Sequence, residues 1–227
     1  MSIVSHGHNE CVNSLVEKLT NAAKVSTIVV IENIKEDIKI WQSPKVKLIS
    51  NKLPLGFGEN HNKASMHVAK GGYFLVLNPD VEFPHNIEDT LQHLLDNIGE
   101  RKGIFSPIHV DKQLNVVSSR RDYLTIFGFI KRQFGINYES DDYWIPGAFM
   151  LFSPDVFESI LFDDLFFMYC EDMDICKRTK LAGYEVGYVD NEYPIIHEGQ
   201  RQSKKSITHF IFHIISLLRY FYKWRSK

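Results

Sequence analysis

Short apolar runs alternate, along the first hundred residues, with longer segments in which apolar residues recur every three or four positions. The short runs, such as STIVVI at 26–31 and YFLVL at 73–77, are rich in β-branched and aromatic residues and predict strands covered on both faces. The pattern predicts strands at 2–6, 26–31, 46–50 and 73–77, and helices at 10–24, 60–69 and 84–98. Strands and helices in this order predict an α/β fold, with a mostly parallel central sheet and helices on both of its faces.

After Gly103 the rhythm changes, and the apolar runs follow one another more closely. They predict two strands of a hairpin-like region and then a third strand, at 104–110, 114–119 and 143–153. Pro146 and Gly147 interrupt the third strand, because proline cannot donate to a ladder and glycine often marks a close backbone approach. A further helix follows an acidic segment, ends near Leu181 and is closed by Gly183.

The last predicted element is a helix over residues 206–224 with a wide apolar face. Its apolar residues recur at helical spacing, at Ile207, Phe210, Ile211, Ile214, Leu218 and Phe221. Polar residues make the segment unsuited to spanning a bilayer, namely His209, His213, Ser216 and Arg219. Two interpretations stay open: the apolar face packs on the rest of the protein, or it lies in a membrane interface.

Charge is distributed unevenly, although the net charge of the 227 residues is only -2. From Gln200 onward there are seven Lys or Arg and no Asp or Glu, whereas residues 1–199 carry an acidic excess. A basic amphipathic helix with aromatic residues near its end suits an anionic membrane surface, so we expect residues 206–227 to meet one. We do not expect nucleic acid as a partner.

Composition bounds the class of protein further. A hydrophobic content of 44% in 227 residues suits one large α/β domain, or a domain with a small appendage. Three cysteines form no even framework and no metal-type pair, which favours a reducing cytosol. No signal peptide and no run of about 20 apolar residues is evident. We therefore expect a cytoplasmic protein, peripheral at the inner face of the cytoplasmic membrane.

Three polar clusters follow predicted strands, at His8-Asn9, Glu32-Asn33 and Asn78-Pro79-Asp80. In open α/β sheets, ligands bind at the carboxyl ends of the strands, where these side chains should converge. Asn-Pro-Asp alone is equally a turn signal. The chain has no G-x-G-x-x-G or Walker-type loop to hold a diphosphate, so a divalent cation on the Asp80 carboxylate is the expected alternative.

A fourth cluster, Glu171-Asp172 and Asp174, follows the aromatic run FFMY. Aromatic surroundings raise the pKa of a carboxyl group and suit a general base, which favours a catalytic role for Glu171 and Asp172. Asp174 has a structural alternative, because acids favour the first turn of a helix and Arg178 lies four residues further on. His197 follows an apolar run and could ligate Mn²⁺ through its imidazole.

Five motifs carry a resemblance over nearly the whole chain. They are, in order, GFGENHNKA at 56–64, LNPDV at 77–81, IPGAFML at 145–151, FFMYCEDMDICKR at 166–178 and IIHEG at 195–199. Their order and spacing resemble those of family 2 glycosyltransferases, and most of all the rhamnosyltransferase-like branch of bacterial surface polysaccharide synthesis. The resemblance implies a GT-A fold, with a catalytic domain over 1–199 (nucleotide-sugar-binding half 1–100, acceptor half 101–199) and the basic helix over 200–227.

The resemblance also implies roles for individual residues. Asp80 stands for the family's DXD motif and binds the metal together with His197, while Asp172 is the catalytic base, with Glu171 beside it. Glu32 departs from the aspartate that is usual before Asn33. Arg120-Arg121 are loosely similar to a basic pair that precedes the acceptor region. The residues nominated for nucleotide-sugar binding are His8, Asn9, Glu32, Asn33, Gly58, Asn62, Asn78, Asp80, Gly147 and Ala148.

The expected function is inverting transfer of a sugar from a nucleotide-diphosphate sugar to a saccharide acceptor, assisted by Mn²⁺ or Mg²⁺. Acceptors in the rhamnosyltransferase-like branch are often lipid-linked, and its products include lipopolysaccharide, O-antigen and capsule. One alternative is a sugar nucleotidylyltransferase, although SHGHNEC after the first strand lacks the glycine-rich basic loop of that class. The other is a non-catalytic module that binds a sugar nucleotide or a glycan.

Overall fold

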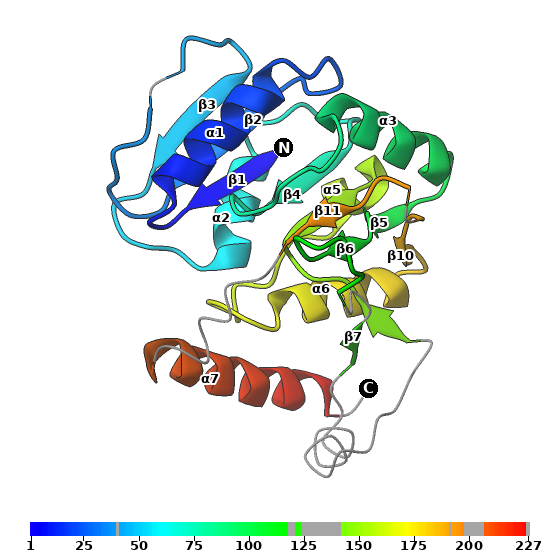
Figure 1. The fold of residues 1–227 in the computed structure, drawn as a ribbon. Coiled ribbons are helices and arrows are strands. Elements are labelled where there is room, and N and C mark those ends of the chain that lie inside the picture. The colour runs from blue at the N-terminus through cyan, green and yellow to red at the C-terminus, as the bar shows by residue number, and fades with distance from the viewer. Residues whose placement is uncertain (40, 118–120, 124–141, 191, 198–206, 226–227) are drawn as a thin grey trace.

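A seven-stranded sheet forms the centre of the computed structural model, which describes residues 1–39, 41–117, 121–123, 142–190, 192–197 and 207–225 (Figure 1). The strands lie in the order β10-β5-β9-β4-β1-β2-β3, and β9 alone runs antiparallel to its two neighbours. Their bounds are β1 Ser2–Ser5, β2 Ile28–Glu32, β3 Val46–Ser50, β4 Phe74–Leu77, β5 Gly103–Ser106, β9 Phe149–Phe152 and β10 Glu185–Tyr188. This is the mostly parallel α/β sheet that the sequence predicts.

Side-chain alternation along the strands divides the core into two layers. In β4, Leu75 and Leu77 join the cluster formed with helices α1 and α3, whereas Phe74 and Val76 join the cluster formed with α5 and α6. Successive side chains of a strand point to opposite faces, so a fully apolar strand needs helices on both sides. The helices are α1 Asn9–Thr20, α2 Phe57–Ser65, α3 Ile87–Ile98, α5 Pro154–Ser159 and α6 Glu171–Leu181.

The hairpin-like region predicted after Gly103 forms only in its second part. Instead, β5 lies in the central sheet, parallel to β10 and antiparallel to β9, and β10 itself is a strand that the sequence analysis does not predict. A short antiparallel hairpin does form further along, where Val110 bridges Val116, Val117 N donates to His109 O and Asp111 N donates to Asn115 O, while residues 118 and 119 lie outside the described residues. Ile104 and Phe105 are fully buried, and insertion into the sheet covers both faces of this strand in a way that a local hairpin would not.

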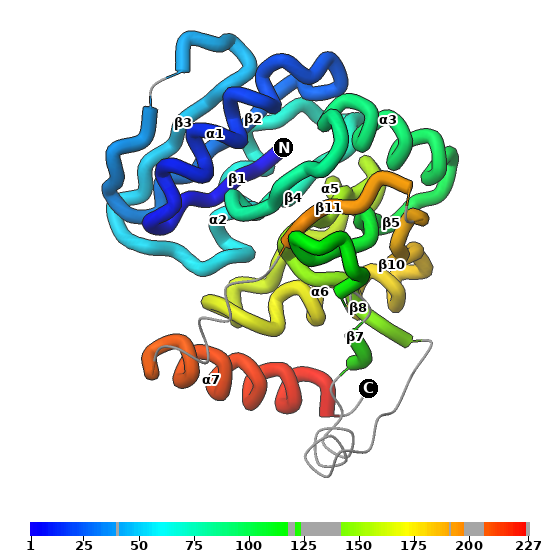
Figure 2. The backbone as a smooth tube through the Cα atoms, in the orientation of Figure 1, coloured from blue at the N-terminus to red at the C-terminus, as the bar shows by residue number. Residues whose placement is uncertain are grey.

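Two small sheets extend the fold beside the central one (Figure 2). In the first, β6 (His109–Val110) pairs in parallel with β11 (Ile195–Ile196), and Glu82 bridges Ile196 from the other side. In the second, β7 (Arg121–Asp122) pairs antiparallel with β8 (Tyr143–Trp144). These pairings bring segments that are far apart in sequence next to the carboxyl ends of β4 and β5.

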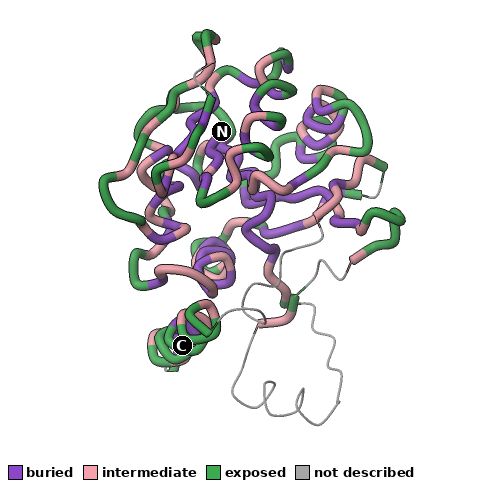
Figure 3. The backbone as a smooth tube through the Cα atoms, turned by 60° about the vertical axis from the view of Figure 1, so that its left-hand side comes forward, coloured by how far each residue is buried: buried purple, intermediate pink, exposed green. Residues whose placement is uncertain are grey.

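The C-terminal helix α7 (Ile207–Trp224) lies outside the two main layers, alongside α6 (Figures 1 and 3). Its inner face packs Leu217, Tyr220 and Trp224 against residues of α6 and of the segment before it. Its outer side remains exposed, and five of the six apolar positions singled out in the sequence lie there, at Ile207, Phe210, Ile211, Ile214 and Leu218. The start of the predicted helix at residue 206 and the boundary at 199/200 lie outside the described residues.

Asp174 ties α7 to α6. Its side chain is fully buried, and it accepts hydrogen bonds from Trp224 Nε1 at 3.0 Å and from Arg178 Nε at 2.7 Å, with Lys223 Nζ also 2.7 Å away. The structural alternative for Asp174 is therefore confirmed, including its pairing with Arg178. Among the described residues, no helix is both long enough and apolar enough to cross a membrane.

The buried Asp174 predicts a large stability effect. Asp174→Asn removes the buried carboxylate that Arg178 and Lys223 share and leaves Lys223 only its pair with Asp163, which should lower the free energy of unfolding by about 3 kcal/mol, the lower end for a broken buried pair. Urea denaturation measures the change. Asp155→Asn is the matched control, because Asp155 pairs with Lys102 at the surface, and it should change stability far less. Equal effects of the two substitutions would contradict the anchoring role of Asp174.

Candidate functional site

The carboxyl edge of the sheet gathers the segments that the motifs nominate. Because β9 runs antiparallel to β4, its first residues lie at the edge where β4 ends, and Asn78 N donates to Ala148 O at 2.8 Å. Ala148, one of the residues nominated for nucleotide-sugar binding, is buried and exposes no side chain to a ligand. Asn78 and Asp80 are half-buried. Asp80 follows in a turn, where Pro79 ends the strand.

Asp80 and His197 meet although 117 positions separate them in the sequence. His197 Nε2 lies 3.6 Å from Asp80 Oδ1. The cause is backbone pairing, because Glu82 and Ile196 exchange two hydrogen bonds of 3.0 and 2.8 Å while His197 N donates to Val110 O. Burial lowers the pKa of His197, which Asp80 partly offsets and Arg121 reinforces, so the ring is neutral near pH 7 and offers a lone pair.

This pair fits a divalent cation. A carboxylate oxygen and an imidazole nitrogen both suit Mn²⁺, and two ligands of one octahedral ion lie about 3 Å apart, close to the separation observed. Both side chains are partly exposed, at 24% for Asp80 and 14% for His197, so an ion and a phosphate could reach them. The two residues that the sequence proposes as metal ligands therefore lie together.

Asp172 sits at the start of α6, against the glycine that opens β9. Its Oδ2 accepts from Gly147 N at 3.2 Å and its Oδ1 accepts from Met173 N at 2.8 Å. A Cβ on Gly147 would lie 3.0 Å from the Phe57 ring and 3.7 Å from Asp172 Cβ, so a small residue is needed for this approach. Burial raises the pKa of Asp172, while the charge of Arg121 and the two backbone N–H groups oppose that shift.

Glu171 is buried beside Asp172, and its Oε2 has no hydrogen-bond partner among the described residues. Burial raises the pKa of Glu171 well above its usual range, and the charge of Asp172 raises it further. Two adjacent carboxyl groups in low dielectric do not ionise independently, so they share their charge as a pair. The pair thus differs from two surface acids at a helix N-terminus.

Arg121 is the basic residue that the structure adds to this site. Its guanidinium lies 5.1 Å from the centre of the Trp144 ring, and its charge lowers the pKa of both Asp172 and His197. The position of Arg121 near both groups suits a cation that faces a diphosphate. Arg120, its neighbour in the loosely matched basic pair, lies outside the described residues.

Asn33 forms the centre of a polar network at the end of β2. Its amide accepts from Leu55 N at 2.8 Å and from Asn51 Nδ2 at 2.9 Å, and donates to Leu55 O at 3.0 Å. Asn51 also donates to the buried Asn60 at 2.7 Å. With 6% exposure, Asn33 holds the 51–56 segment in place, and a contact with the nucleotide stays a prediction.

The other nominees at the ends of β1 and β2 are held by local hydrogen bonds. Glu32 accepts from Glu36 N at 2.9 Å, and its pKa is lowered, first by a hydrogen bond from Ser50. Asn9 Oδ1 accepts from Glu10 N at 3.0 Å, and His8 Nδ1 is buried without a partner among the described residues. Their roles toward a nucleotide also stay predictions.

Gly58 and Asn62 lie on the side of α2 that packs against the rest of the protein. A Cβ on Gly58 would lie 2.5 Å from Phe162 Cβ, and Asn62 both donates to Phe162 O and accepts from Phe162 N, each at 2.9 Å. These contacts assign the two residues to the packing of α2 on the 162–164 segment. Binding of the nucleotide sugar by either one is not tested by the structure.

Glu36 is a residue that the sequence analysis overlooks. Its carboxylate accepts from Gly7 N at 2.8 Å and from Ser5 Oγ at 3.0 Å, and so it holds the chain where β1 ends. Glu36 lies four residues beyond the end of β2 and in none of the five motifs, so neither pattern nor resemblance marks it. His109, fully buried and 5.9 Å from the His197 ring centre, is likewise unmarked in the sequence.

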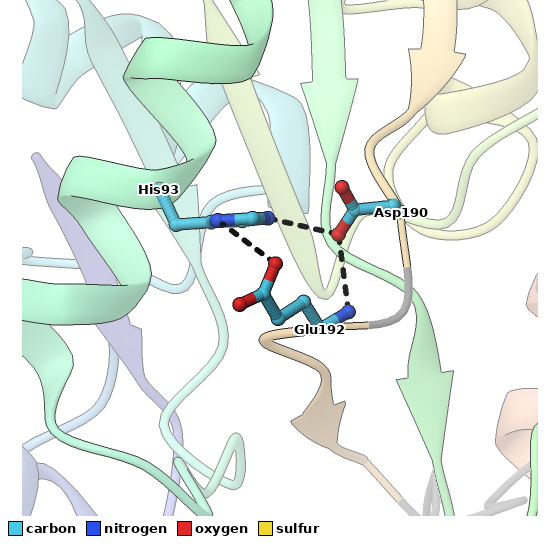
Figure 4. A group of neighbouring side chains, drawn as sticks. All are labelled: His93, Asp190 and Glu192. Carbon is cyan, nitrogen blue, oxygen red and sulfur yellow. Dashed lines mark hydrogen bonds and ion pairs between the residues drawn. The ribbon is translucent and has the colours of Figure 1, made fainter.

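A different His–acid cluster lies on the surface beside α3 (Figure 4). His93 Nε2 is 2.8 Å from Asp190 Oδ1, while Glu192 Oε2 approaches the other ring nitrogen, Nδ1, at 3.8 Å. The two carboxylates thus approach opposite sides of one imidazole, whereas a single ion would take only one ring nitrogen. This arrangement is that of a surface ion-pair network and not of a metal cage.

Comparison with known proteins identifies the class. No family model matches the chain. In fold it resembles solved glycosyltransferase structures, including mannosyltransferase PcManGT from Pyrobaculum calidifontis in complex with GDP-Man and Mn²⁺ (TM-score 0.62, 12% identity, 96% of this chain and 63% of that one). GalNAc-T7 with UDP, GalNAc and Mn²⁺ (TM-score 0.63, 16% identity) is matched over 86% of this chain and 42% of that one. The chain thus spans less than two thirds of these structures, and the likeness establishes the GT-A fold.

A curated relative extends this from fold to family. The chain is 30% identical over 244 residues to rhamnosyltransferase WbbL of Escherichia coli (strain K12), and the alignment covers 96% of this chain and 90% of that protein. The chain belongs to the family 2 glycosyltransferases, as its motifs indicate. Glycosyl transfer is therefore its chemistry, in preference to nucleotidyl transfer or to binding alone.

The raised pKa of Glu171 predicts a pH-dependent stability. A carboxyl group whose pKa is raised by folding stabilises the fold below its unfolded pKa of about 4.3, and this contribution is lost as the pH rises through the folded pKa. Glu171→Gln removes the ionisation. Relative to the wild type, the variant should therefore gain stability between pH 4 and pH 7.5, as measured by urea denaturation. Glu10→Gln, on the surface of α1, is the control, and an identical pH dependence in both variants would contradict the burial effect.

Proposed function

We propose that this protein transfers a sugar, with inversion, from a nucleotide-diphosphate sugar to a saccharide acceptor. One observation carries the proposal: the Asp80–His197 pair and the pair formed by the buried Glu171 and the half-buried Asp172 lie at the same edge of one sheet, with the charge of Arg121 acting on both. The first pair suits the diphosphate of a donor, and the second suits the hydroxyl of an acceptor. A binding module would have no use for the second pair.

On the donor side, Asp80 and His197 hold a divalent cation, Mn²⁺ or Mg²⁺. When bound, such a cation neutralises the charge that develops on a leaving nucleoside diphosphate. Arg121 adds a fixed positive charge on the same side. PcManGT and GalNAc-T7 were solved with Mn²⁺ and a nucleotide or nucleotide sugar, which supports the same class of ligands for this chain.

On the acceptor side, Asp172 removes the proton from the attacking hydroxyl group. The Gly147 N–H holds one of its carboxylate oxygens in place, and burial raises its pKa toward the range that suits a general base at neutral pH. Burial, and then the charge of Asp172, raise the pKa of Glu171, so Glu171 holds the proton of the coupled pair while Asp172 carries the charge. The transition state has oxocarbenium character, and direct displacement by the acceptor needs no covalent enzyme intermediate.

The likeness to rhamnosyltransferase WbbL favours a rhamnosyl-type or hexosyl donor. The motif resemblance favours a role in lipopolysaccharide, O-antigen or capsule synthesis. Saccharide acceptors in the rhamnosyltransferase-like branch are often lipid-linked, so the enzyme would work in the cytoplasm, peripherally at the inner face of the membrane. The proposed division is a catalytic domain over 1–199 and a membrane-facing segment over 200–227.

The metal role is tested by Asp80→Ala. Turnover, measured as nucleoside diphosphate release from a panel of UDP-, GDP- and other nucleotide sugars, should fall to background. EDTA should abolish turnover by the wild type. Binding of Mn²⁺ in the presence of the nucleoside diphosphate, followed by calorimetry, should weaken in parallel. Asp89→Ala, at an exposed position of α3, is the control. Full turnover of the wild type in EDTA would refute the metal role.

The base is tested by Asp172→Asn. The amide keeps the size of the side chain but cannot take up the proton, so turnover should fall roughly 10²–10⁴-fold. Affinity for the nucleoside diphosphate should change little, because Asp80 and His197 are untouched. A variant that retains its turnover and loses only thermal stability would show that Asp172 is a structural residue of the α6 N-terminus.

We also propose that α7 binds an anionic membrane surface through its outer side. Ile207, Phe210 and Leu218 are 54–81% exposed, and no Asp or Glu occurs anywhere in the last 28 residues, where seven Lys or Arg do. Exposed apolar side chains in a segment with an excess of basic residues match the composition of an interfacial helix. A membrane surface, where lipid-linked acceptors reside, is thus the occupant favoured over a second protein.

Co-sedimentation with anionic liposomes tests this proposal. Removing α7 would expose the apolar side chains that it buries, so the informative variant is Phe210→Ser combined with Ile214→Ser and Leu218→Ser. Pelleting should fall several-fold relative to the wild type and should weaken with salt. The control replaces Leu53, Met66 and Leu181 by serine; these residues are 64–75% exposed, more than Phe210 and Ile214, but lie elsewhere. Equal pelleting of the two triple variants, or self-association of the wild type without lipid binding, would refute the proposal.

A further inference from the structure

The backbone that presents the catalytic pair has an unusual conformation. Tyr169 and Cys170, immediately before Glu171, both adopt positive φ values, of 70° and 67°. Residues other than glycine rarely adopt such values, and two in succession persist only where the surroundings hold them. Cys170 caps α6, so this turn sets where the helix begins and where the Asp172 carboxylate lies.

Helix α7 supplies much of what holds this turn. Ser216 Oγ donates to Met168 O at 2.7 Å, and Arg219 donates to Leu165 O at 2.7 Å. Lys223 lies 2.5 Å from Asp163 Oδ2. The three side chains recur at helical spacing on one side of α7, and together they bind the segment 163–168 along its length.

The turn residues themselves contact α7. Tyr169 OH is hydrogen-bonded to His209 Nδ1 at 3.0 Å, and the Tyr169 ring lies 5.1 Å from that of His213. Cys170 is buried in one cluster with Leu217 and Tyr220 of α7. The charge of Asp172 raises the pKa of His213, against the larger effect of burial, so α7 reaches the neighbourhood of the carboxylate itself.

The opposite side of the same segment is also constrained. Phe57 N donates to Phe167 O at 2.8 Å, and a Cβ on Gly56 would lie 2.7 Å from Phe167 O. The segment is therefore held between α2 and α7. Loosening the α7 side alone would leave the segment bound to α2 only, and the turn at Tyr169 and Cys170 would lose the support that α7 provides.

We propose that α7 is a working part of the catalytic centre, in which Ser216 and the Tyr169–His209 pair are positioning residues for Asp172. The inference rests on the proposed role of Asp172 as the base. A small displacement of a reacting group is costly, and about 1 Å can reduce a rate roughly 100-fold. The inner side of α7 would then serve catalysis, whatever its outer side meets.

Two single-atom changes test the inference, Ser216→Ala and Tyr169→Phe. Each removes one hydroxyl group that holds the turn and leaves the apolar packing in place. Turnover per active site should fall about 10-fold or more, while the donor KM and the Kd of the nucleoside diphosphate stay within about twofold of wild type. Active sites are counted by calorimetric titration with the nucleoside diphosphate of whichever nucleotide sugar the wild type uses, so partial unfolding does not mimic the effect.

The matched controls are Thr208→Ala and Tyr222→Phe, each of which removes a hydroxyl group (with one methyl group at Thr208) from an exposed position of α7 and should leave turnover unchanged. Wild-type turnover per site in both Ser216→Ala and Tyr169→Phe, even with a lower melting temperature, would overturn the inference. Asp172→Asn is assayed in parallel. If it too retains turnover, the base assignment fails; if it alone is inactive, the base stands and the positioning role of α7 is wrong.

Discussion

The pairing of β4 with the antiparallel strand β9 is the constraint on which the site depends. Reversing one strand in an otherwise parallel sheet places the beginning of β9 beside the end of β4, where Asn78 N bonds to Ala148 O. Gly147 is thereby brought to the edge where Asp80 stands, and its N–H is directed at Asp172. A parallel β9 would carry Gly147 to the opposite edge and separate the cation ligands from the base.

Burial then decides the electrostatics of the site. Glu171 is buried and Asp172 is half-buried, and this burial disfavours charge on both groups, while Gly147, Met173 and Arg121 restore part of the stabilisation to Asp172 alone. Glu171 has an unpartnered oxygen and no comparable support. The environment therefore separates the pKa values of the two acids, and Asp172 is the one that can be ionised and ready to accept a proton.

Helix α7 combines two unlike surfaces. Its inner side carries the buried contacts to Asp174 and the hydrogen bonds to the segment before α6, while its outer side exposes large apolar residues. A helix that merely completed a core would have no reason to leave such residues uncovered, and a helix that merely anchored the chain would need no hydrogen bonds beside the catalytic pair. The two surfaces together fit the two roles proposed for α7, membrane binding by its outer side and support of the active site by its inner side.

The sequence by itself determined most of the elements, because hydrophobic periodicity reports local structure: the run 46–50 is a strand and the acidic segment starts α6, as predicted. It also determined the family and nominated Asp80, His197 and Asp172, since motif residues stand beside strand ends. Tertiary structure decided that β5 joins the central sheet, that Asp80 meets His197 through the Glu82–Ile196 bridge, and that Glu36 and Arg121 belong near the site. These contacts join residues far apart in the chain, and no local pattern encodes a pairing that depends on the packing of the whole sheet.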